Sequence, residues 1–335
     1  MKGFCDRLSR RAALAGGAAL ALASAVPGAR ASEAGPLKIA SLKFGTVNWL
    51  LDTIKAETDA RGEAAPFERT DLASTQALTV ALQAGQCDLT VSDWPWAMRR
   101  RIEGGEAFRF APYSSALGAL MVAKGSPIAT LSDLKGKKIG VAGGPIDKSW
   151  LLFRAYAHKE VGGDIATMAE PVFGAPPLLS EQLRLGRIDA ALTFWNFAAR
   201  LDADGYRRLV DMAEVMKRLG LDPPPPLVGF VWRDQLFEKA GPALDRFFRA
   251  VAAANETLKT SDAAWERLRP SMQVRSDAEF TKLRDYYRDG VHGPWTRDEI
   301  GSAQKLYGLL TDLGGPEFVG PNPRFDPDLF WSPKA

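Results

Sequence analysis

The chain has 335 residues, of which 46% are hydrophobic and 25% charged, and its formal net charge is +3. This length is sufficient for two lobes that each bury a core. Five of the 43 basic residues but only one of the 40 acidic residues, Asp6, lie before residue 32, so the remaining chain carries a formal charge of −1. A nearly neutral protein has no electrostatic basis for binding nucleic acid or an anionic membrane, and we expect neither partner.

The first 31 residues have the pattern of a secretory signal peptide. A basic segment ends in Ser9-Arg10-Arg11, an apolar run extends from Ala12 to Val26, and Ala29-Arg30-Ala31 is a cleavage pattern. The paired arginines resemble a twin-arginine signal, but Ala13 stands where phenylalanine is usual, so general secretion stays an alternative. We therefore expect a periplasmic protein that begins near Ser32.

The residues available for metal binding or catalysis are few. Cys87 is the one cysteine left after the predicted cleavage, and its apolar surroundings predict a buried, inert thiol. His158 and His292 are far apart in the sequence, which gives no zinc-binding spacing. The chain also lacks the G-x-S-x-G, Walker A and G-x-G-x-x-G motifs. We expect no metal site, no cofactor and no catalytic residues.

The first part of the chain predicts a βαβαβ unit. An apolar strand from Leu37 is followed by a glycine-containing turn at 44–47 and a helix over 49–61. Ser74 is the predicted N-cap of a helix that runs through Gln83 and ends at Gly85. The other predicted elements are strands over 67–72, 87–91 and 108–113 and a short helix over 98–103.

The second part predicts a similar series. A strand over 114–124 is expected to cross between lobes, and the proline-rich segment 222–226 leads into a returning strand over 227–232. The elements between them are strands over 139–142, 170–173 and 189–194 and helices over 150–159 and 178–185. Helices are expected over 236–313, and an irregular tail after Gly314. The predicted boundaries are 37–115 for lobe 1, 116–226 for lobe 2, and 227–335 for the return to lobe 1 and the C-terminal helices.

A short sequence unit occurs twice. Leu82–Val91 and Leu183–Leu192 both read as a helix end, a glycine and then a strand that begins with aspartate. Two such units favour two lobes of similar construction.

These features together resemble the periplasmic substrate-binding proteins of ABC importers. The resemblance is to the nitrate/sulfonate/taurine branch, which is related to binders of thiamine-pyrimidine precursors. It rests on the leader, on 37–45 and 82–93, and on the segments Leu131–Val141, Leu185–Ala191 and Trp232–Phe237. It implies an α/β, two-lobed periplasmic binding protein fold of type II (Venus flytrap), with a mixed sheet flanked by helices in each lobe and two crossing strands. It also implies a monomer that captures a small organic or anionic solute between its lobes and delivers it to an ABC permease in the inner membrane.

The candidate ligand-binding residues lie where loops follow strands, because ligands of open α/β sheets bind outside the carboxyl ends of strands. Aromatic rings there can stack on a ligand, hydroxyls and amides can bond it, and accessible amides near Gly143 and Gly144 suit an anion. The candidates are Phe44, Thr46, Asn48, Trp49, Ser92, Asp93, Trp94, Ser115, Gly144, Asp147, Ser149, Phe173, Trp195 and Asn196.

Structural roles compete with each of these assignments. The aromatic residues could belong to the core, the paired glycines could form a tight turn, and Asp93 and Asp147 could cap helices. Phe194–Phe197 also lacks the proline usual in this family, and Ser92–Trp96 is heavier than the expected glycine-rich loop. Both departures argue against the family's small-anion ligands.

Two other functions fit the same sequence. One is an enzyme on this scaffold, similar to a pyrimidine-synthesising relative, which would need a catalytic lysine and histidine such as Lys148 and His158. The other is a sensory protein that presents its closed form to a receptor. We expect a binding protein and not an enzyme.

Overall fold

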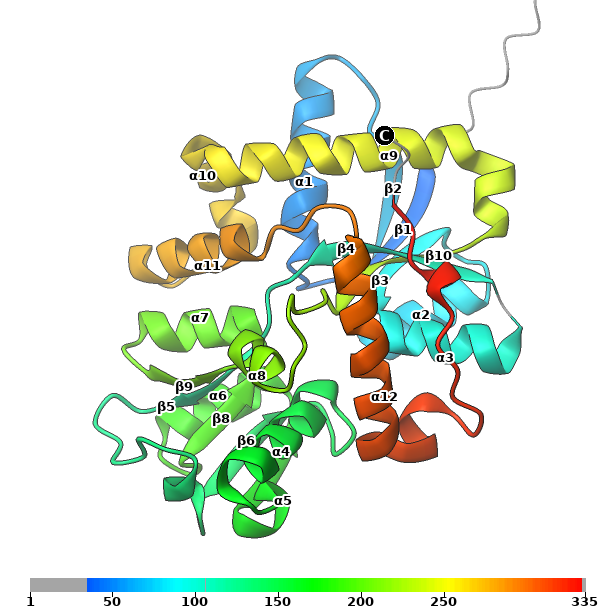
Figure 1. Ribbon diagram of the computed structural model, residues 1–335. Helices are drawn as coiled ribbons and strands as arrows, with labels where there is room; N and C mark the ends of the chain where they lie inside the picture. The colour runs from blue at the N-terminus through cyan, green and yellow to red at the C-terminus, as the bar shows by residue number, and fades with distance from the viewer. Residues whose placement is uncertain (1–34, 106, 333–335) are drawn as a thin grey trace, which may run out of the picture. The chain divides into compact units, whose positions relative to one another are not determined.

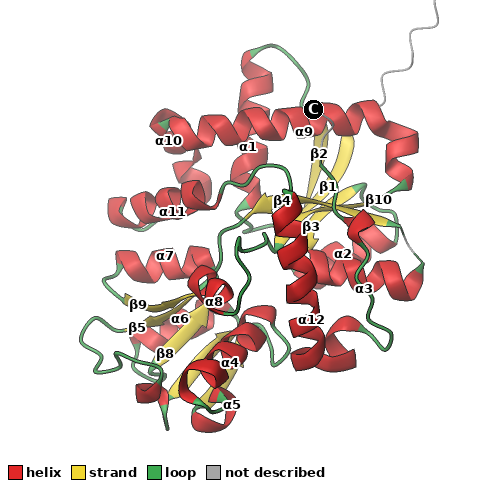
Figure 2. Ribbon diagram, viewed as in Figure 1, coloured by secondary structure: helices red, strands yellow, loops and turns green. Residues whose placement is uncertain are grey.

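The computed structural model describes residues 35–105 and 107–332, so the predicted signal peptide and export route lie outside the described residues. The described chain contains two five-stranded mixed sheets, each flanked by helices (Figures 1 and 2). This arrangement confirms the α/β fold class and the two similarly built lobes. None of the helices within 35–332 combines the length and apolar character needed to span a membrane.

The sheet of lobe 1 has the strand order β2-β1-β3-β10-β4. Strand β1 is parallel to β2 and β3, whereas β10 is antiparallel to β3 and β4. Its strands are β1 (Leu37–Leu42), β2 (Phe67–Leu72), β3 (Leu89–Asp93), β4 (Phe108–Ser114) and β10 (Val228–Arg233). The helices between them are α1 (Val47–Ala60), α2 (Thr75–Gln83) and α3 (Trp94–Gly104).

Two helix starts in lobe 1 follow from local chemistry. The Ser74 hydroxyl accepts a hydrogen bond from the Ala77 amide at 3.1 Å, which confirms the predicted cap of α2. Helix α3 begins at Trp94 and not near residue 98, because Asp93 caps it and Pro95 suits its first turn. The segment Ser92–Trp96 is therefore a strand end joined directly to a helix.

The sheet of lobe 2 has the order β7-β6-β8-β5-β9, with parallel pairs β6–β7 and β6–β8 and antiparallel pairs β5–β8 and β5–β9. Its strands are β5 (Ala119–Val122), β6 (Lys138–Ala142), β7 (Glu170–Gly174), β8 (Ala190–Thr193) and β9 (Arg207–Asp211). Its helices are α4 (Lys148–Val161), α5 (Ile165–Met168), α6 (Pro176–Arg184), α7 (Trp195–Ala203) and α8 (Met212–Arg218), after the short 3-10 turn η1 (Ser132–Leu134). The elements α5, β9 and α8 are absent from the sequence-based prediction.

The repeated sequence unit has the same role in both lobes. Asp88 accepts a hydrogen bond from the Lys38 amide at 2.7 Å, and its own amide donates to the Lys38 carbonyl. Asp189 makes the equivalent pair of bonds to Lys138, with a side-chain distance of 2.8 Å. Each aspartate thus ties the start of one strand to the start of its parallel neighbour, β3 to β1 in lobe 1 and β8 to β6 in lobe 2.

The crossing between the lobes differs from the prediction. The expected continuous strand over 114–124 is two strands, because β4 ends at Ser114 and β5 begins at Ala119. Gly118 lies between them, where an added Cβ would be 1.9 Å from the carbonyl oxygen of Thr193. A side chain at that position would prevent β5 from pairing with β8.

The C-terminal part is mainly helical and contacts both lobes. Its elements are α9 (Gln235–Thr260), α10 (Asp262–Met272), α11 (Asp277–Gly290), α12 (Arg297–Val319) and the 3-10 turn η2 (Pro327–Leu329). Helix α9 packs on α1, α11 packs on α7, and α12 contacts both α3 and α4 (Figure 1). The helix α12 continues past a kink at Gly315, so the irregular tail begins after Val319 and not after Gly314. The Trp331 amide then bonds the Phe110 carbonyl on the edge strand β4 at 2.9 Å.

Candidate functional site

Four strand–helix connections define the candidate site. In lobe 1, the connections after β1 and β3 are neighbours because these strands are adjacent and parallel. The connections after β6 and β8 in lobe 2 are neighbours for the same reason. Side-chain contacts between the lobes join the two pairs of connections, and the candidate residues concentrate there.

The first contact between the lobes is made by aromatic side chains and is called the aromatic junction. Trp49, at the start of α1, and Trp195, at the start of α7, have ring centroids 6.1 Å apart in an edge-to-face arrangement. Tyr287 of α11 lies 6.0 Å from Trp49 and 6.2 Å from Trp195. Trp49 is buried, whereas Trp195 keeps part of its surface exposed. The three rings therefore connect α1, α7 and α11.

Buried hydroxyl groups accompany these rings. Tyr113, at the end of β4, lies 6.3 Å from Tyr287 between ring centroids, and neither phenol oxygen has a hydrogen bond of normal geometry. Burial raises the pKa of Tyr113 to about 12, and the nearby hydroxyls of Thr46 and Tyr287 offset part of that rise. Burial also raises the pKa of Tyr287 well above its usual value. Both hydroxyls are therefore neutral at ordinary pH.

The two polar atoms of the Asn48 side chain differ in their hydrogen bonding. Its amide nitrogen donates to the carbonyls of Leu42 and Lys43 at 2.9 and 3.4 Å, which holds the turn between β1 and α1. Its side chain is 8% exposed, and its Oδ1 atom is buried without a hydrogen-bond partner. Asn48 therefore keeps one acceptor atom without a protein partner, whereas its amide nitrogen holds the turn.

The second contact between the lobes is an ion pair. Lys148, at the start of α4, places its Nζ atom 3.3 Å from Oδ2 of Asp93, which ends β3. The side chains are 19% and 28% exposed. Burial opposes the charge of Lys148, but the carboxylates of Asp93 and Asp147 outweigh it and raise the lysine pKa. The ion pair is thus a contact between lobe 1 and lobe 2.

Both acidic residues also cap helices, as the competing assignment expected. Asp93 accepts a hydrogen bond from the Trp96 amide at 3.0 Å, and Asp147 accepts one from the Ser149 amide at 2.9 Å. Burial raises the pKa of Asp147, although Lys148 and the helix amides oppose the rise. The amide of Ser149 is therefore occupied by the cap. Ser92 remains a partly exposed residue of β3.

The glycine loop before α4 is only partly available. Gly143 has φ of +95°, and its amide donates to the Gly174 carbonyl at 3.2 Å. An added Cβ at Gly143 would lie 3.1 Å from the Cβ and Oδ2 atoms of Asp147. The prediction that Gly143 leaves its amide accessible is therefore wrong, whereas Gly144 has open space around its Cα.

Helices α1 and α7 differ from α3 and α4 because no side chain caps them. Their N-cap positions are Thr46 and Phe194, and neither side chain accepts a bond from the first turn. Asn196 is partly exposed in the first turn of α7. Backbone carbonyls take part of this role, because the Asn48 and Trp49 amides of α1 donate to Gly45 and Thr46 at 3.1 and 3.2 Å.

Four other predicted ligand-binding residues have environments of different kinds. Trp94 is fully buried and packs 5.6 Å from Phe330, which assigns its ring to the core and corrects the expectation that it faces a ligand. Phe44 is 73% exposed, and Phe173 on the edge strand β7 has its ring centroid 6.1 Å from that of Trp150. Ser115 lies in the first crossing, where its amide donates to the Gly290 carbonyl at 2.9 Å.

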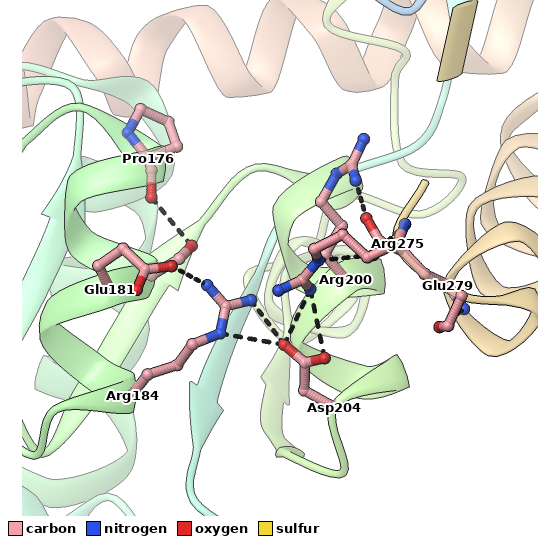
Figure 3. A network of polar contacts seen from close by, with 9 residues as sticks. Pro176, Glu181, Arg184, Arg200, Asp204, Arg275 and Glu279 are labelled. Carbon is pink, nitrogen blue, oxygen red and sulfur yellow. Dashed lines mark hydrogen bonds and ion pairs between the residues drawn. The ribbon is translucent and has the colours of Figure 1, made fainter. Parts of the chain in front are cut away.

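A network of ion pairs lies beside the aromatic junction, between α7 and α11 (Figure 3). The buried carboxylate of Glu279 contacts Arg200 of α7 and accepts from Nε of Arg275 at 2.8 Å. Asp204, just after α7, bonds Arg184 at 2.6 Å and Arg275 at 3.1 Å. Charged side chains therefore reinforce the packing of lobe 2 against the C-terminal helices.

A separate cavity of about 230 Å³ lies on lobe 1, between β4, α9 and the Trp331 segment. It is lined by Ala111, Phe248, Asn255, His292 and Trp331, among others, and contains none of the predicted ligand residues. Its His292 is bonded to Glu299 at 2.8 Å. Within the described part of the chain, no group of three or more histidine, cysteine or acidic side chains is placed to hold a metal ion.

Sequence reasoning missed Tyr113 and Tyr287. Tyr113 is read simply as the end of a strand, and Tyr287 belongs to a helix 238 residues after Trp49 in the sequence. No local pattern links a C-terminal helix to the β1 connection, because only the tertiary fold brings them together. The ring contacts, not a motif, reveal them.

Comparisons with known proteins agree with this geometry. The profile of the family described as "NMT1/THI5 like" matches residues 72–260. The structure is similar to the periplasmic aliphatic sulphonate binding protein SsuA from Escherichia coli, with a TM-score of 0.69, 18% identity, and coverage of 90% of this chain and 93% of that one. The alkanesulfonate-binding protein SsuA from Xanthomonas axonopodis pv. citri, bound to MOPS, gives 0.64 and 18%, with coverage of 87% and 96%.

An enzyme shares the fold as well. The desulfurization enzyme DSZB matches with a TM-score of 0.59 and 16% identity, over 87% of this chain and 94% of that one. No curated protein matches the chain at a significant level. At these identities the structural matches establish the two-lobed periplasmic binding protein fold, which confirms the predicted fold.

Proposed function

The chain belongs to the NMT1/THI5-like family, and from this premise we propose that it is the extracytoplasmic solute-binding component of an ABC importer. In this role it binds a small molecule between its lobes and delivers it to a membrane permease. The observation that carries the proposal is the pair of contacts between the lobes, Trp49 with Trp195 and Asp93 with Lys148. They place aromatic and charged side chains where two sheets of the same topology meet. Similar proteins of this fold are named as periplasmic sulfonate binders.

The alternative of catalysis is disfavoured by the positions of its two required residues. Lys148 begins α4, and His158 lies ten residues further along the same helix, which at about 1.5 Å per residue separates them by about 15 Å. His158 is also exposed. A lysine and a histidine at opposite ends of one helix do not form a compact catalytic pair.

The location and partners extend the proposal. We propose that residues 1–31 are removed on export and that the mature protein is a periplasmic monomer. Its lobes comprise 37–115 with 227–335, and 116–226. An inner-membrane permease is then the partner that recognises the closed form, whereas a sensor would present the same form to a receptor. Ligand-dependent uptake through the cognate permease separates these two roles.

The test is a thermal-shift screen of the mature protein that begins at Ser32. The compounds should span sulfonates, nitrate, carboxylates, aromatic acids, pyrimidines and amines. A ligand at a hundredfold excess over its Kd stabilises the folded protein by about 2.7 kcal/mol. The same ligand should decrease the radius of gyration in small-angle X-ray scattering as the lobes close. Absence of any stabilising compound, or stabilisation without closure, counts against the proposal.

A variant pair makes the screen specific for the site. Trp195→Ala removes a partly exposed ring of the aromatic junction and should weaken binding at least tenfold, which is about 1.4 kcal/mol. Phe237→Ala removes an exposed ring on α9, outside the site, and is the matched control. Equal affinities of the two variants would place the ligand elsewhere.

A further inference from the structure

The end of α11 is attached to the first crossing between the lobes. The carbonyl of Gly290, the last residue of α11, accepts a hydrogen bond from the Ser115 amide at 2.9 Å, and Val291 forms an antiparallel bridge with Ser114. An added Cβ at Gly290 would lie 2.5 Å from the Cβ atom and 2.9 Å from the amide nitrogen of Ala116. Glycine therefore allows the two backbones to approach this closely. This attachment is called the α11 clip.

The α11 clip holds the start of the crossing on lobe 1. Ser114 ends β4 of the lobe 1 sheet, and its Oγ atom accepts a hydrogen bond from the Ala116 amide at 3.1 Å. The buried side chains of α11, which are Phe280, Leu283 and Tyr287, share a hydrophobic cluster with α1, α9 and α10. The chain is therefore attached to lobe 1 as far as the nitrogen of Ala116.

The other end of the same crossing is held on lobe 2. The Gly118 carbonyl accepts a hydrogen bond from the amide of Met212, which begins α8, at 3.2 Å. Gly118 also packs on the backbone of β8, since an added Cβ would lie 1.9 Å from the Thr193 carbonyl oxygen. Strand β5 begins at the next residue and pairs with β8 and β9. From Gly118 onward, the chain is therefore part of lobe 2.

The second crossing is stiff along its length. On lobe 2, the Leu221 amide donates to the Met216 carbonyl of α8 at 2.9 Å, and on lobe 1 the Leu227 carbonyl accepts from the Trp94 amide at 3.2 Å. The segment between them, 222–226, is an aspartate followed by four prolines. Each proline ring fixes φ at about −65°, so this segment resists bending. The first crossing must therefore supply most of the rotation between the lobes.

We propose that the α11 clip confines the pivot of the two lobes to Ala116 and Leu117, which lie between the clip and the attachment of Gly118. The proposal rests on the proposed function, because it specifies how the lobes open and close around a ligand. Hinges are short segments whose torsions absorb the change in domain orientation. Without the clip, Ser115 joins the pivot and the lobes reach a wider range of orientations. Gly290 is thus a positioning residue for closure.

The test measures distances between the lobes in the mature protein without any ligand. Val80→Cys on α2 and Leu178→Cys on α6 provide labelling sites, because these side chains are 54% and 55% exposed. Cys87→Ala removes the buried native thiol. Spin labels on the two introduced cysteines report the distribution of interlobe distances by double electron–electron resonance. A two-residue pivot predicts a narrow distribution for the parent protein.

Three glycine substitutions separate the clip from general stability. Gly290→Ala brings a methyl group against the backbone nitrogen of Ala116, so the clip must separate and the distribution should widen by about half or more. Gly293→Ala lies in the same connection with nothing within 4 Å and should leave the width unchanged. Gly140→Ala crowds Ile188 at 2.5 Å inside lobe 2, so it should lower the melting temperature without widening the distribution. Equal widths for Gly290→Ala and either control overturn the proposal.

An insertion tests the pivot even if Gly290→Ala fails to fold. One glycine inserted between Ala116 and Leu117 lengthens the pivot without crowding the clip, so it should widen the distribution. One glycine inserted after Gly125, an exposed position of lobe 2 with nothing within 4 Å, is the control and should leave the width unchanged. Equal widths for the two insertions overturn the proposal.

The absence of ligand from this experiment separates its outcome from that of the proposed function. A compound that stabilises and closes the protein, together with clip and pivot variants of unchanged width, supports the proposed function and refutes the pivot. Widening in Gly290→Ala and in the insertion at the pivot supports the pivot, even if every compound in the thermal-shift screen fails and the proposed function is lost.

Discussion

The contact between α7 and α11 depends on one buried charge, and its removal gives a measurable prediction. Glu279 is 1% exposed, and its carboxylate contacts Arg200 and Arg275. Arg200 also donates to the Met272 carbonyl at 2.9 Å. Arg200→Met leaves Glu279 with the more exposed Arg275 alone and leaves the Met272 carbonyl without its donor. Loss of one partner of a buried ion pair costs 3–5 kcal/mol, and because Arg275 remains, we expect about 3 kcal/mol.

The reverse substitution should cost less. Glu279→Met leaves Arg200 with its bond to Met272 and with partial access to water, so we expect about 2 kcal/mol. Burial lowers the pKa of Arg200, and repulsion from Arg275 and Arg184 lowers it further. The double variant removes both opposite charges. Its total cost should therefore fall below the sum of the single costs by at least about 1.5 kcal/mol.

The assay is urea-induced unfolding of the mature protein, followed by tryptophan fluorescence. Free energies of unfolding are compared between variants that show the same dependence on urea concentration. Arg184→Met is the control, because Arg184 pairs with the mostly exposed Glu181 and with Asp204 on the surface. Its cost should stay below about 1 kcal/mol. Additivity of the two single variants within about 0.5 kcal/mol would refute the reasoning.

Three further outcomes follow from the structure. Gly143→Ala should lower the free energy of unfolding by about 1–2 kcal/mol, since φ is +95° and the methyl group meets Asp147, whereas Gly144→Ala should change it little; equal thermal shifts would contradict this. Burial raises the pKa of the Cys87 thiol to about 11 from 9.0, so the folded state holds this proton more tightly. The stabilisation by the protonated thiol is present below pH 9 and is lost as the pH rises through 11, by up to about 2.7 kcal/mol. Cys87→Ala should therefore flatten the pH dependence of the free energy of unfolding between pH 9 and 11. Asp88→Ala and Asp189→Ala should each cost about 1–2 kcal/mol and add within error, because they lie in different lobes.

The repeated elements could be predicted from the sequence because their determinants are local. Ser74 caps α2 and Phe67–Leu72 is a strand, as the sequence indicates. The aspartates of the repeated unit precede β3 and β8 and bond the neighbouring parallel strand in the same manner. Helix caps, glycines that end helices and apolar runs each depend on a few neighbouring residues. A single sequence is therefore enough to recognise them.

The weakly patterned elements could not be predicted. Strand β9 is Arg207–Asp211, whose alternation is obscured by two arginines at an exposed sheet edge. The continuous strand expected over 114–124 is interrupted because Gly118 must pass within contact of the Thr193 carbonyl. Such limits arise from close approach between distant segments, which a single sequence does not reveal.

The site shows the same division. Trp49 and Asp93 are found at the predicted strand ends, but their environments differ from expectation: Trp49 is buried, and Asp93 both caps a helix and pairs with Lys148. Trp94 has the same local pattern as its neighbours, yet its ring points into the core. The sequence locates a loop, whereas the packing around it decides which side chain is available.

The repeat finally explains why the site has two chemically different halves. Strand β1 corresponds to β6, and β3 corresponds to β8, in the sheet orders of the two lobes. The contacts pair unlike ends: Trp49, after β1, meets Trp195, after β8, and Asp93, at the end of β3, meets Lys148, after β6. The connection after β1 therefore faces the connection after β8, and the connection after β3 faces the one after β6. One such pairing joins the two uncapped, aromatic helix ends and the other joins the two ends capped by carboxylates.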